Sequence, residues 1–126
     1  MHIRSLAGLG LATALACAAI PAAAAGWGAV LSNGPVVDFN DEDMRLFLDA
    51  IRRTLSATGA PQPVEWANPA SGAGGNLLVL AQPKVTGFDE CRRVRATVFS
   101  RRQQGKPATW TACKDPAGQW KLVSAK

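Results

Sequence analysis

The sequence predicts an α+β fold, in which one N-terminal amphipathic helix packs on a small antiparallel sheet of four to five strands. Three observations on the 126-residue chain lead to this prediction. One long segment, 41–57, carries apolar residues at helical spacing. The segments after it are short and β-type, and clusters of turn residues separate them. The length allows one small domain.

Residues 1–25 have the pattern of a secretory signal peptide. Arg4 supplies positive charge, and an apolar run ends at Pro21 before four alanines that suit a signal peptidase. This run is shorter than the ~20 residues that a membrane-spanning helix needs, and nothing after it resembles a second membrane segment. We expect an exported protein, periplasmic or associated with the outer membrane. Lipidation of Cys17 is an alternative, although the residues before it match a lipobox poorly.

The folded domain is expected over 38–126, after a flexible, glycine-containing lead-in over 26–37. The helix over 41–57 begins after Asn40, which can cap it, and three acidic residues in its first turn suit its positive end. Gly59 and Pro61 end it. The apolar residues expected on its buried face are Met44, Phe47, Leu48, Ile51 and Leu55.

The β-type segments that follow are bounded by turn residues. Strands are expected at 63–66, 76–82, 91–101, 108–114 and 119–123. The clustered glycines of 71–75 predict a loop, because glycine weakens a strand. Turns are expected at Gln104–Gly105 and over 115–118.

Residues 91–101 alternate between apolar and basic side chains, which predicts one face toward the helix and one away from it. The apolar side is Val94, Ala96 and Val98, and the outer basic side is Arg93, Arg95 and Arg101. Arg92 and Arg102 are expected to flank the basic side. The simpler interpretation is a solvated face whose charges discourage aggregation. The alternative is a face that binds anionic envelope lipid, lipopolysaccharide phosphate or an envelope protein, since export makes nucleic acid an unsuitable partner.

Two cysteines, Cys91 and Cys113, remain once the leader is removed. An even pair in an oxidising compartment predicts a disulfide. Both stand at the parity opposite to Val94 and Ala112, so both belong to the outer face and would bridge one hairpin. A two-residue turn at Gln104–Gly105 would centre that hairpin further along, so a longer turn or a bulge is expected.

The sequence offers little for catalysis, because its single histidine, His2, lies in the leader. Without a histidine, most hydrolytic triads, Cys–His pairs and common zinc sites lose a required residue. We expect no enzymatic activity, no cofactor and no metal. Trp66, Asn68 and Ser71 border the glycine-rich loop and form a candidate interaction loop, the simpler interpretation being that Ser71 bonds the backbone.

Four short motifs occur in order along the chain: WANPASG at 66–72, CR at 91–92, TACK at 111–114 and GQW at 118–120. In this order and spacing they resemble the C-terminal domain of the bacterial 17 kDa surface antigen family. Typical members carry a glycine-zipper segment ahead of this domain, and no zipper is visible in this sequence. The resemblance implies an envelope location and no established enzymatic activity.

These observations favour a non-enzymatic, secreted cell-envelope protein, similar to a surface antigen, with a structural or interaction role at the periplasm or outer membrane. The alternative is a soluble periplasmic binding or inhibitor protein that blocks an enzyme such as a lysozyme.

Overall fold

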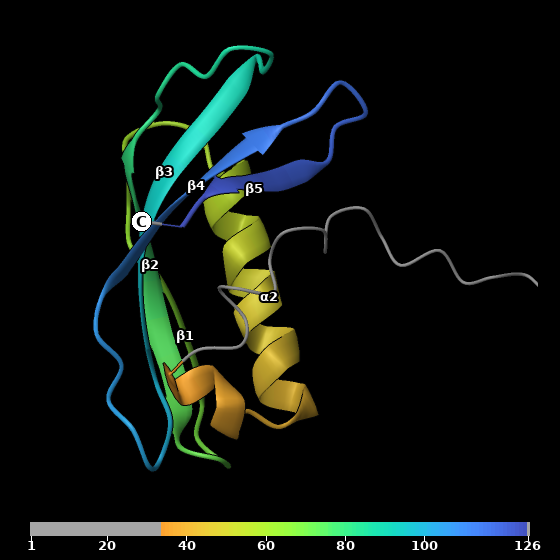
Figure 1. Cartoon of the computed structure of the whole chain (residues 1–126). Helices are drawn as coiled ribbons and strands as arrows, with labels where there is room; N and C mark the ends of the chain where they lie inside the picture. Colours follow the sequence, from red (N-terminus) through yellow and green to blue (C-terminus); the bar gives the residue numbers. More distant parts are fainter. Residues whose placement is uncertain (1–33, 126) are drawn as a thin grey trace, which may run out of the picture.

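The computed structural model describes residues 34–125 (Figure 1). A short 3-10 helix, η2, precedes one α-helix, α2, and five strands follow. Their bounds are η2 Gly34–Asp38, α2 Asp41–Ser56, β1 Val64–Asn68, β2 Ala73–Ala81, β3 Glu90–Phe99, β4 Ala108–Lys114 and β5 Trp120–Ser124. The predicted α+β class is confirmed. The leader and the first part of the lead-in lie outside the described residues.

The five strands form one antiparallel sheet in the order β1-β2-β3-β4-β5, so each strand pairs with the next one along the chain. The helix lies on one face of this sheet, mainly against β1 and β2 (Figure 1). A helix is about 10 Å across and neighbouring strands lie about 4.8 Å apart, so one helix covers roughly two strands. Over β3 the inner face is approached instead by η2.

The helix begins as the sequence predicts, with Asn40 as its cap. The Asp43 backbone N–H donates to Asn40 Oδ1 at 2.8 Å, and the Asn40 N–H donates to Asp43 Oδ2 at 3.0 Å. This reciprocal pair is a capping box. The prediction that Leu48 is buried is wrong, since 45% of it is exposed. The buried stripe instead includes Ala50 and Thr54, and Leu48 falls on its flank.

The glycine-rich segment contradicts the predicted loop, because Gly74 and Gly75 lie inside β2. Gly75 pairs with residues of both neighbouring strands, Trp66 on β1 and Val98 on β3. A Cβ at Gly75 would lie only 2.3 Å from the Thr97 carbonyl oxygen, so the neighbouring strands come too close for a side chain there. The glycines therefore serve close strand packing, and the loop shrinks to 69–72.

The connection between β3 and β4 is longer than a two-residue hairpin, so the predicted turn at Gln104–Gly105 is wrong. The strand β3 ends at Phe99, and the Ser100 N–H donates to the Gln103 carbonyl at 2.8 Å where the chain reverses. The expected longer turn is thus confirmed, and it places Cys91 opposite Cys113. The predicted turn over 115–118 is also confirmed.

The core lies between α2, η2 and the inner face of the sheet. Its largest fully buried apolar side chains are Trp110, Phe47, Leu77 and Val94. Trp110 and Val94 confirm the alternation predicted for β3 and β4. In η2, Pro35 and Val36 are buried, so this end of the expected lead-in belongs to the packed domain.

Candidate functional site

The WANPASG segment fastens the N-terminus of α2 to the sheet through one buried carboxylate. Asp43 is 1% exposed. Its Oδ1 accepts hydrogen bonds from Asn68 Nδ2 at 2.7 Å and from Ser71 Oγ at 2.6 Å. With the Asn40 N–H on Oδ2, three donors surround the carboxylate. The motif residues thus hold the turn between β1 and β2 against the first turn of the helix.

The same contacts keep Asp43 charged. Burial alone would raise the pKa of Asp43, but hydrogen bonds from Ser71, the Asn40 backbone and Asn68 outweigh it, and the pKa lies below its ordinary value. Asp43 therefore stays ionised at neutral pH and accepts the hydrogen bond from the Ser71 hydroxyl as a carboxylate. Ser71 Oγ also accepts a hydrogen bond from the Ala73 N–H at 3.2 Å, as the simpler interpretation expected.

The candidate interaction loop therefore faces inward. The structure brings Asn68 and Ser71 together on Asp43, and Trp66 is packed separately against the helix side, with only 6% of Trp66 and 8% of Asn68 exposed. The Trp66 ring packs beside Phe39 and Phe47, with ring centroids 5.3 Å and 5.6 Å away. Sequence reasoning assigned Asp43 to the helix dipole and missed its role here, although its position three residues after Asn40 is a capping-box signal.

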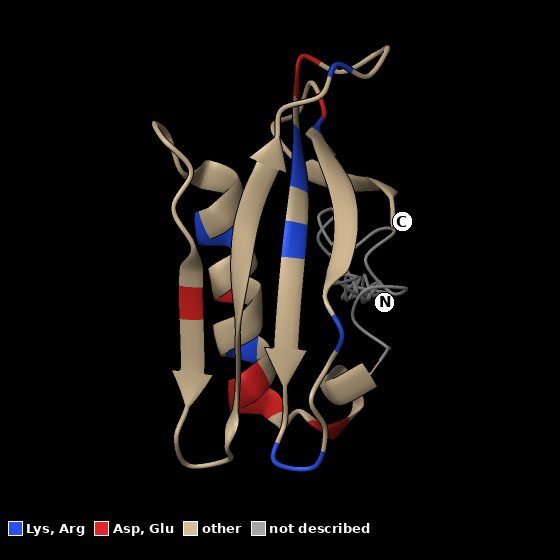
Figure 2. Ribbon diagram, turned by 90° about the vertical axis from the view of Figure 1, so that its left-hand side faces the viewer, with Lys and Arg blue, Asp and Glu red and all other residues tan. Residues whose placement is uncertain are grey.

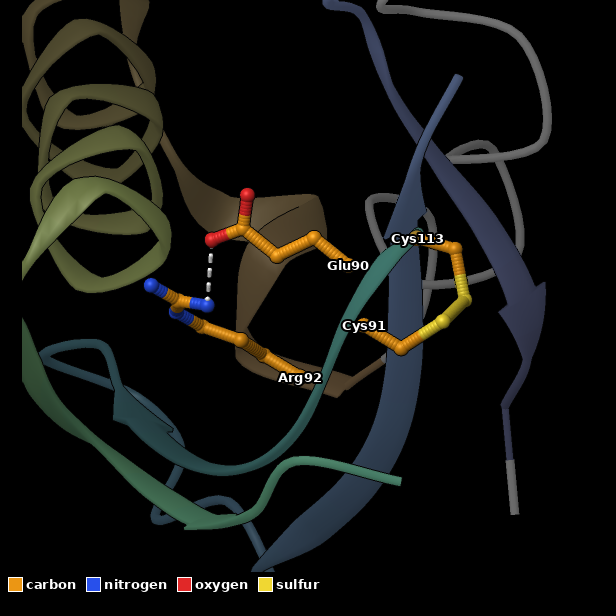
Figure 3. The surroundings of a disulfide bond; sticks show 4 residues. All are labelled: Glu90, Cys91, Arg92 and Cys113. Carbon is orange, nitrogen blue, oxygen red and sulfur yellow. Dashed lines mark hydrogen bonds and ion pairs between the residues drawn. A yellow bond between two sulfur atoms is a disulfide. The ribbon is translucent and has the colours of Figure 1, made fainter. Parts of the chain in front are cut away.

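A second set of motif residues fastens the C-terminus of α2. Arg92 is 6% exposed, and its Nη2 donates to the Ala57 carbonyl oxygen at 3.1 Å, just beyond the last helical residue. Its Nη1 pairs with Glu90 at 2.8 Å, and its guanidinium carbon lies 5.4 Å from the centre of the Trp120 ring. The expectation that Arg92 flanks the outer basic side is wrong, because its side chain points toward the helix (Figure 3).

The predicted disulfide between Cys91 and Cys113 is confirmed. The two residues are directly opposed on β3 and β4, with Cα atoms 4.1 Å apart. The bridge projects from the side of the strands opposite to Arg92 (Figure 3). The CR and TACK motifs therefore act on both faces of the sheet: the cysteines join β3 to β4, and Arg92 joins β3 to the helix.

The outer face of β3 carries Arg93 and Arg95, which share the parity of Cys91 and are both exposed. Their cross-strand neighbours are uncharged: Thr111 and Thr109 on β4, and Ala81 and Leu78 on β2. Within residues 34–125, neither guanidinium takes part in an ion pair. These two arginines will be called the outer arginine pair.

Arg101 lies apart from the outer arginine pair. Because β3 ends at Phe99, Arg101 sits in the β3–β4 loop, where its side chain runs past Gly72. The ribbon of Figure 2 shows this separation along the backbone: blue bands mark the basic residues of β3, Arg92 included, and another blue segment forms the loop at one end of the sheet. The structure thus unites two of the three predicted arginines and places the third beside Arg102.

Two further observations concern only residues 34–125. No group of three or more His, Cys, Asp or Glu side chains that could hold a metal ion is found among them. None of the helices in this part of the chain combines the length and the apolar character needed to cross a bilayer.

These contacts define a class of small helix-on-sheet domain, in which sequence motifs fasten both ends of the helix and a disulfide bridges the middle strands. A sequence model of the 17 kDa outer membrane surface antigens matches residues 53–121. The chain belongs to this family, as the motifs indicated, and the family suggests a cell-envelope surface antigen.

Two relatives illustrate the similarity. Both are 17 kDa surface antigens of Rickettsia bellii, one of them from strain RML369-C, and each is 32% identical over 85 residues. The alignment covers 68% of this chain and 53% of each relative, so the chain spans about half the length of the curated relatives it matches. No solved structure matches the chain.

Proposed function

We propose that the chain is a non-catalytic, exported protein of the cell envelope, and that its outer arginine pair docks on a membrane surface bearing phosphate groups. One observation carries the proposal: Arg93 and Arg95 are exposed side by side on the outer face of the sheet, with uncharged cross-strand neighbours. Guanidinium groups suit phosphate because their planar fork can donate two parallel hydrogen bonds.

The spacing of the pair is compatible with two phosphate contacts. Residues two apart on a strand lie about 6.6 Å apart, at which two unit charges repel by about 0.6 kcal/mol in bulk water. This repulsion is small enough for the folded chain to tolerate. A phosphate between the two groups would turn it into attraction. Near an anionic membrane, each arginine adds about 1 kcal/mol of binding free energy.

Vesicle co-sedimentation tests the proposal. The vesicles contain phosphatidylcholine alone, phosphatidylcholine with phosphatidylglycerol, or phosphatidylcholine with lipopolysaccharide, so that the phosphate source is distinguished. The test variant is Arg93→Gln with Arg95→Gln, and the matched control is Arg101→Gln with Arg102→Gln, which removes the same charge from the loop. Each preparation is measured at low and at physiological salt, because screening weakens exposed electrostatic contacts.

The proposal expects binding to at least one phosphate-bearing vesicle, weaker at higher salt, and roughly 30-fold weaker for the outer-pair variant. The loop variant should lose much less of its affinity for these vesicles. Equal losses in both variants would show that net charge alone matters, and no binding by the unaltered protein would reject membrane docking. A lysozyme assay on the same preparation addresses the inhibitor alternative: the proposal expects unchanged lysozyme activity, and inhibition would favour the alternative.

A further inference from the structure

The inner face of the sheet holds an apolar pocket that α2 does not fill. Because α2 packs on β1 and β2, the inner side of β3 and β4 extends past it, toward η2 (Figure 2). A pocket of about 440 Å³ lies there. Its apolar walls are Val36, Phe47, Ala96, Val98 and Trp110. Small-molecule sites in proteins are typically concave, mostly apolar and roughly 300–1,000 Å³ in volume.

The polar part of the lining comes mainly from the β3–β4 loop and carries one positive charge: it consists of two glutamine amides, of which Gln103 already donates to Asp38, and the Lys106 ammonium. Gln103, Gln104 and Lys106 border the pocket, and no acidic residue is found among its described lining residues. Lys106 is exposed and has no ion pair within residues 34–125. A ligand held here would therefore bury apolar surface at one end. At the other end it would place a negatively charged group that accepts hydrogen bonds.

We propose that this pocket binds the acyl chain of an anionic amphiphile, with its carboxylate or phosphate head beside Lys106. The site is independent of the outer arginine pair, which lies on the opposite face of the sheet. The charge of the lining selects the head: an ammonium head would meet Lys106 with like charge, whereas a carboxylate would pair with it. The apolar walls select the tail.

The proposal predicts a dependence on chain length. Burying one methylene improves affinity by roughly fourfold, so octanoate, decanoate and dodecanoate should bind increasingly tightly until the pocket is full. Decyltrimethylammonium, which has a tail like that of decanoate and a cationic head, should bind at least tenfold more weakly than decanoate.

Isothermal titration calorimetry tests the site, with the protein purified as its host processes it and each probe kept below its micellar concentration. Ala108→Trp places a large ring in the lining from an exposed position and should abolish decanoate binding. Ala117→Trp, in the exposed β4–β5 turn, is its control. Lys106→Gln should weaken decanoate binding by several-fold and strengthen decyltrimethylammonium binding, because the like charge is gone, and Lys84→Gln, outside the pocket, should change neither.

Methyl chemical shifts locate the probe, and Ala96, Val98 and Ala108 should shift on addition of decanoate. One-to-one binding that Ala108→Trp abolishes and that shifts these methyl signals supports the proposal. No binding, or binding that Ala108→Trp leaves intact, overturns it. Nuclear Overhauser contacts between these methyl groups and residues before Gly34 in the ligand-free protein would also overturn the proposal, because the chain itself would then fill the pocket. Concentration-dependent dimerisation that Ala108→Trp prevents would likewise overturn it in favour of a second copy.

Discussion

Asp43→Ala is expected to be among the most damaging single substitutions in the domain, although the residue lies in a first helical turn where acids are ordinary. Removing the carboxylate leaves the buried Asn68 amide and Ser71 hydroxyl without their main acceptor. Each unsatisfied buried donor costs about 1–3 kcal/mol, and loss of the capping contact adds to this. We expect a loss of about 3–5 kcal/mol in the free energy of unfolding.

A domain of this size has a total stability of roughly 5–15 kcal/mol, so the variant should be only marginally folded. The corresponding fall in melting temperature is roughly 15–30 °C. Asp41→Ala is the matched control, because Asp41 is exposed in the same helical turn and its carboxylate accepts no hydrogen bond from any side chain within residues 34–125. Its loss should cost less than about 1 kcal/mol, the contribution of a charge near the helix dipole.

The assay is urea unfolding followed by far-ultraviolet circular dichroism between pH 7 and pH 2.5. Folding lowers the pKa of Asp43, so its charge stabilises the fold above the unfolded value of about 3.9 and loses this effect as the pH falls through the folded value. The unaltered protein should therefore lose stability below about pH 4 more steeply than Asp43→Ala. The reasoning fails if Asp43→Ala costs no more than Asp41→Ala, or if both proteins show the same acid slope.

Three further substitutions test the other contacts. Replacing Cys91 and Cys113 together by alanine opens a loop whose ends lie 22 residues apart, and chain entropy predicts a loss of about 3 kcal/mol, measured by urea unfolding against the oxidised protein. Arg92→Ala removes the hydrogen bond to the helix end and the contact with Trp120, and should cost about 2–4 kcal/mol by the same assay. Gly75→Ala puts a methyl group 2.3 Å from a backbone oxygen, and should lower stability by about 2–3 kcal/mol in thermal denaturation.

Each of these three has an outcome that would contradict it. Two free thiols in protein taken from the native envelope would show that the disulfide between Cys91 and Cys113 does not form there. For Arg92, the control is Arg93→Ala on the outer face, which should change stability by less than about 0.5 kcal/mol, and equal effects would argue against a buried role. A Gly75→Ala protein with unchanged melting temperature would show that β1 and β3 do not lie as close to Gly75 of β2 as described.

The elements governed by local patterns could be predicted from the sequence. The helix follows from its apolar spacing and from Asn40, and the alternation over 91–99 assigns inner and outer faces that the structure confirms. The disulfide also follows, since parity puts both cysteines on one face and the expected export predicts an oxidising environment.

The sequence predictions fail for residues whose role depends on contacts with distant parts of the chain. Glycine weakens a strand on its own, and only the close approach of β1 and β3 around Gly75 explains why glycine is needed there. In the sequence Arg92 looks like one more member of a basic run, yet the pleat turns its side chain toward the end of the helix, where the Ala57 carbonyl oxygen accepts a hydrogen bond from it. Asp43 likewise looks like an acid that only complements the helix dipole. Its second role depends on the β1–β2 turn, which places Asn68 and Ser71 within hydrogen-bond distance of its carboxylate.

The central claim, that the outer arginine pair holds this envelope protein on a phosphate-bearing membrane surface, is tested most directly by fractionating the native host. Membranes are washed at low and at high salt, and the protein is quantified in each wash and in the soluble periplasm. The account predicts that the unaltered protein stays with membranes at low salt and is released at high salt. The variant Arg93→Gln with Arg95→Gln should be found in the soluble fraction, while Arg101→Gln with Arg102→Gln should stay with membranes. Retention of the outer-pair variant on membranes to the same extent as the unaltered protein would contradict the claim.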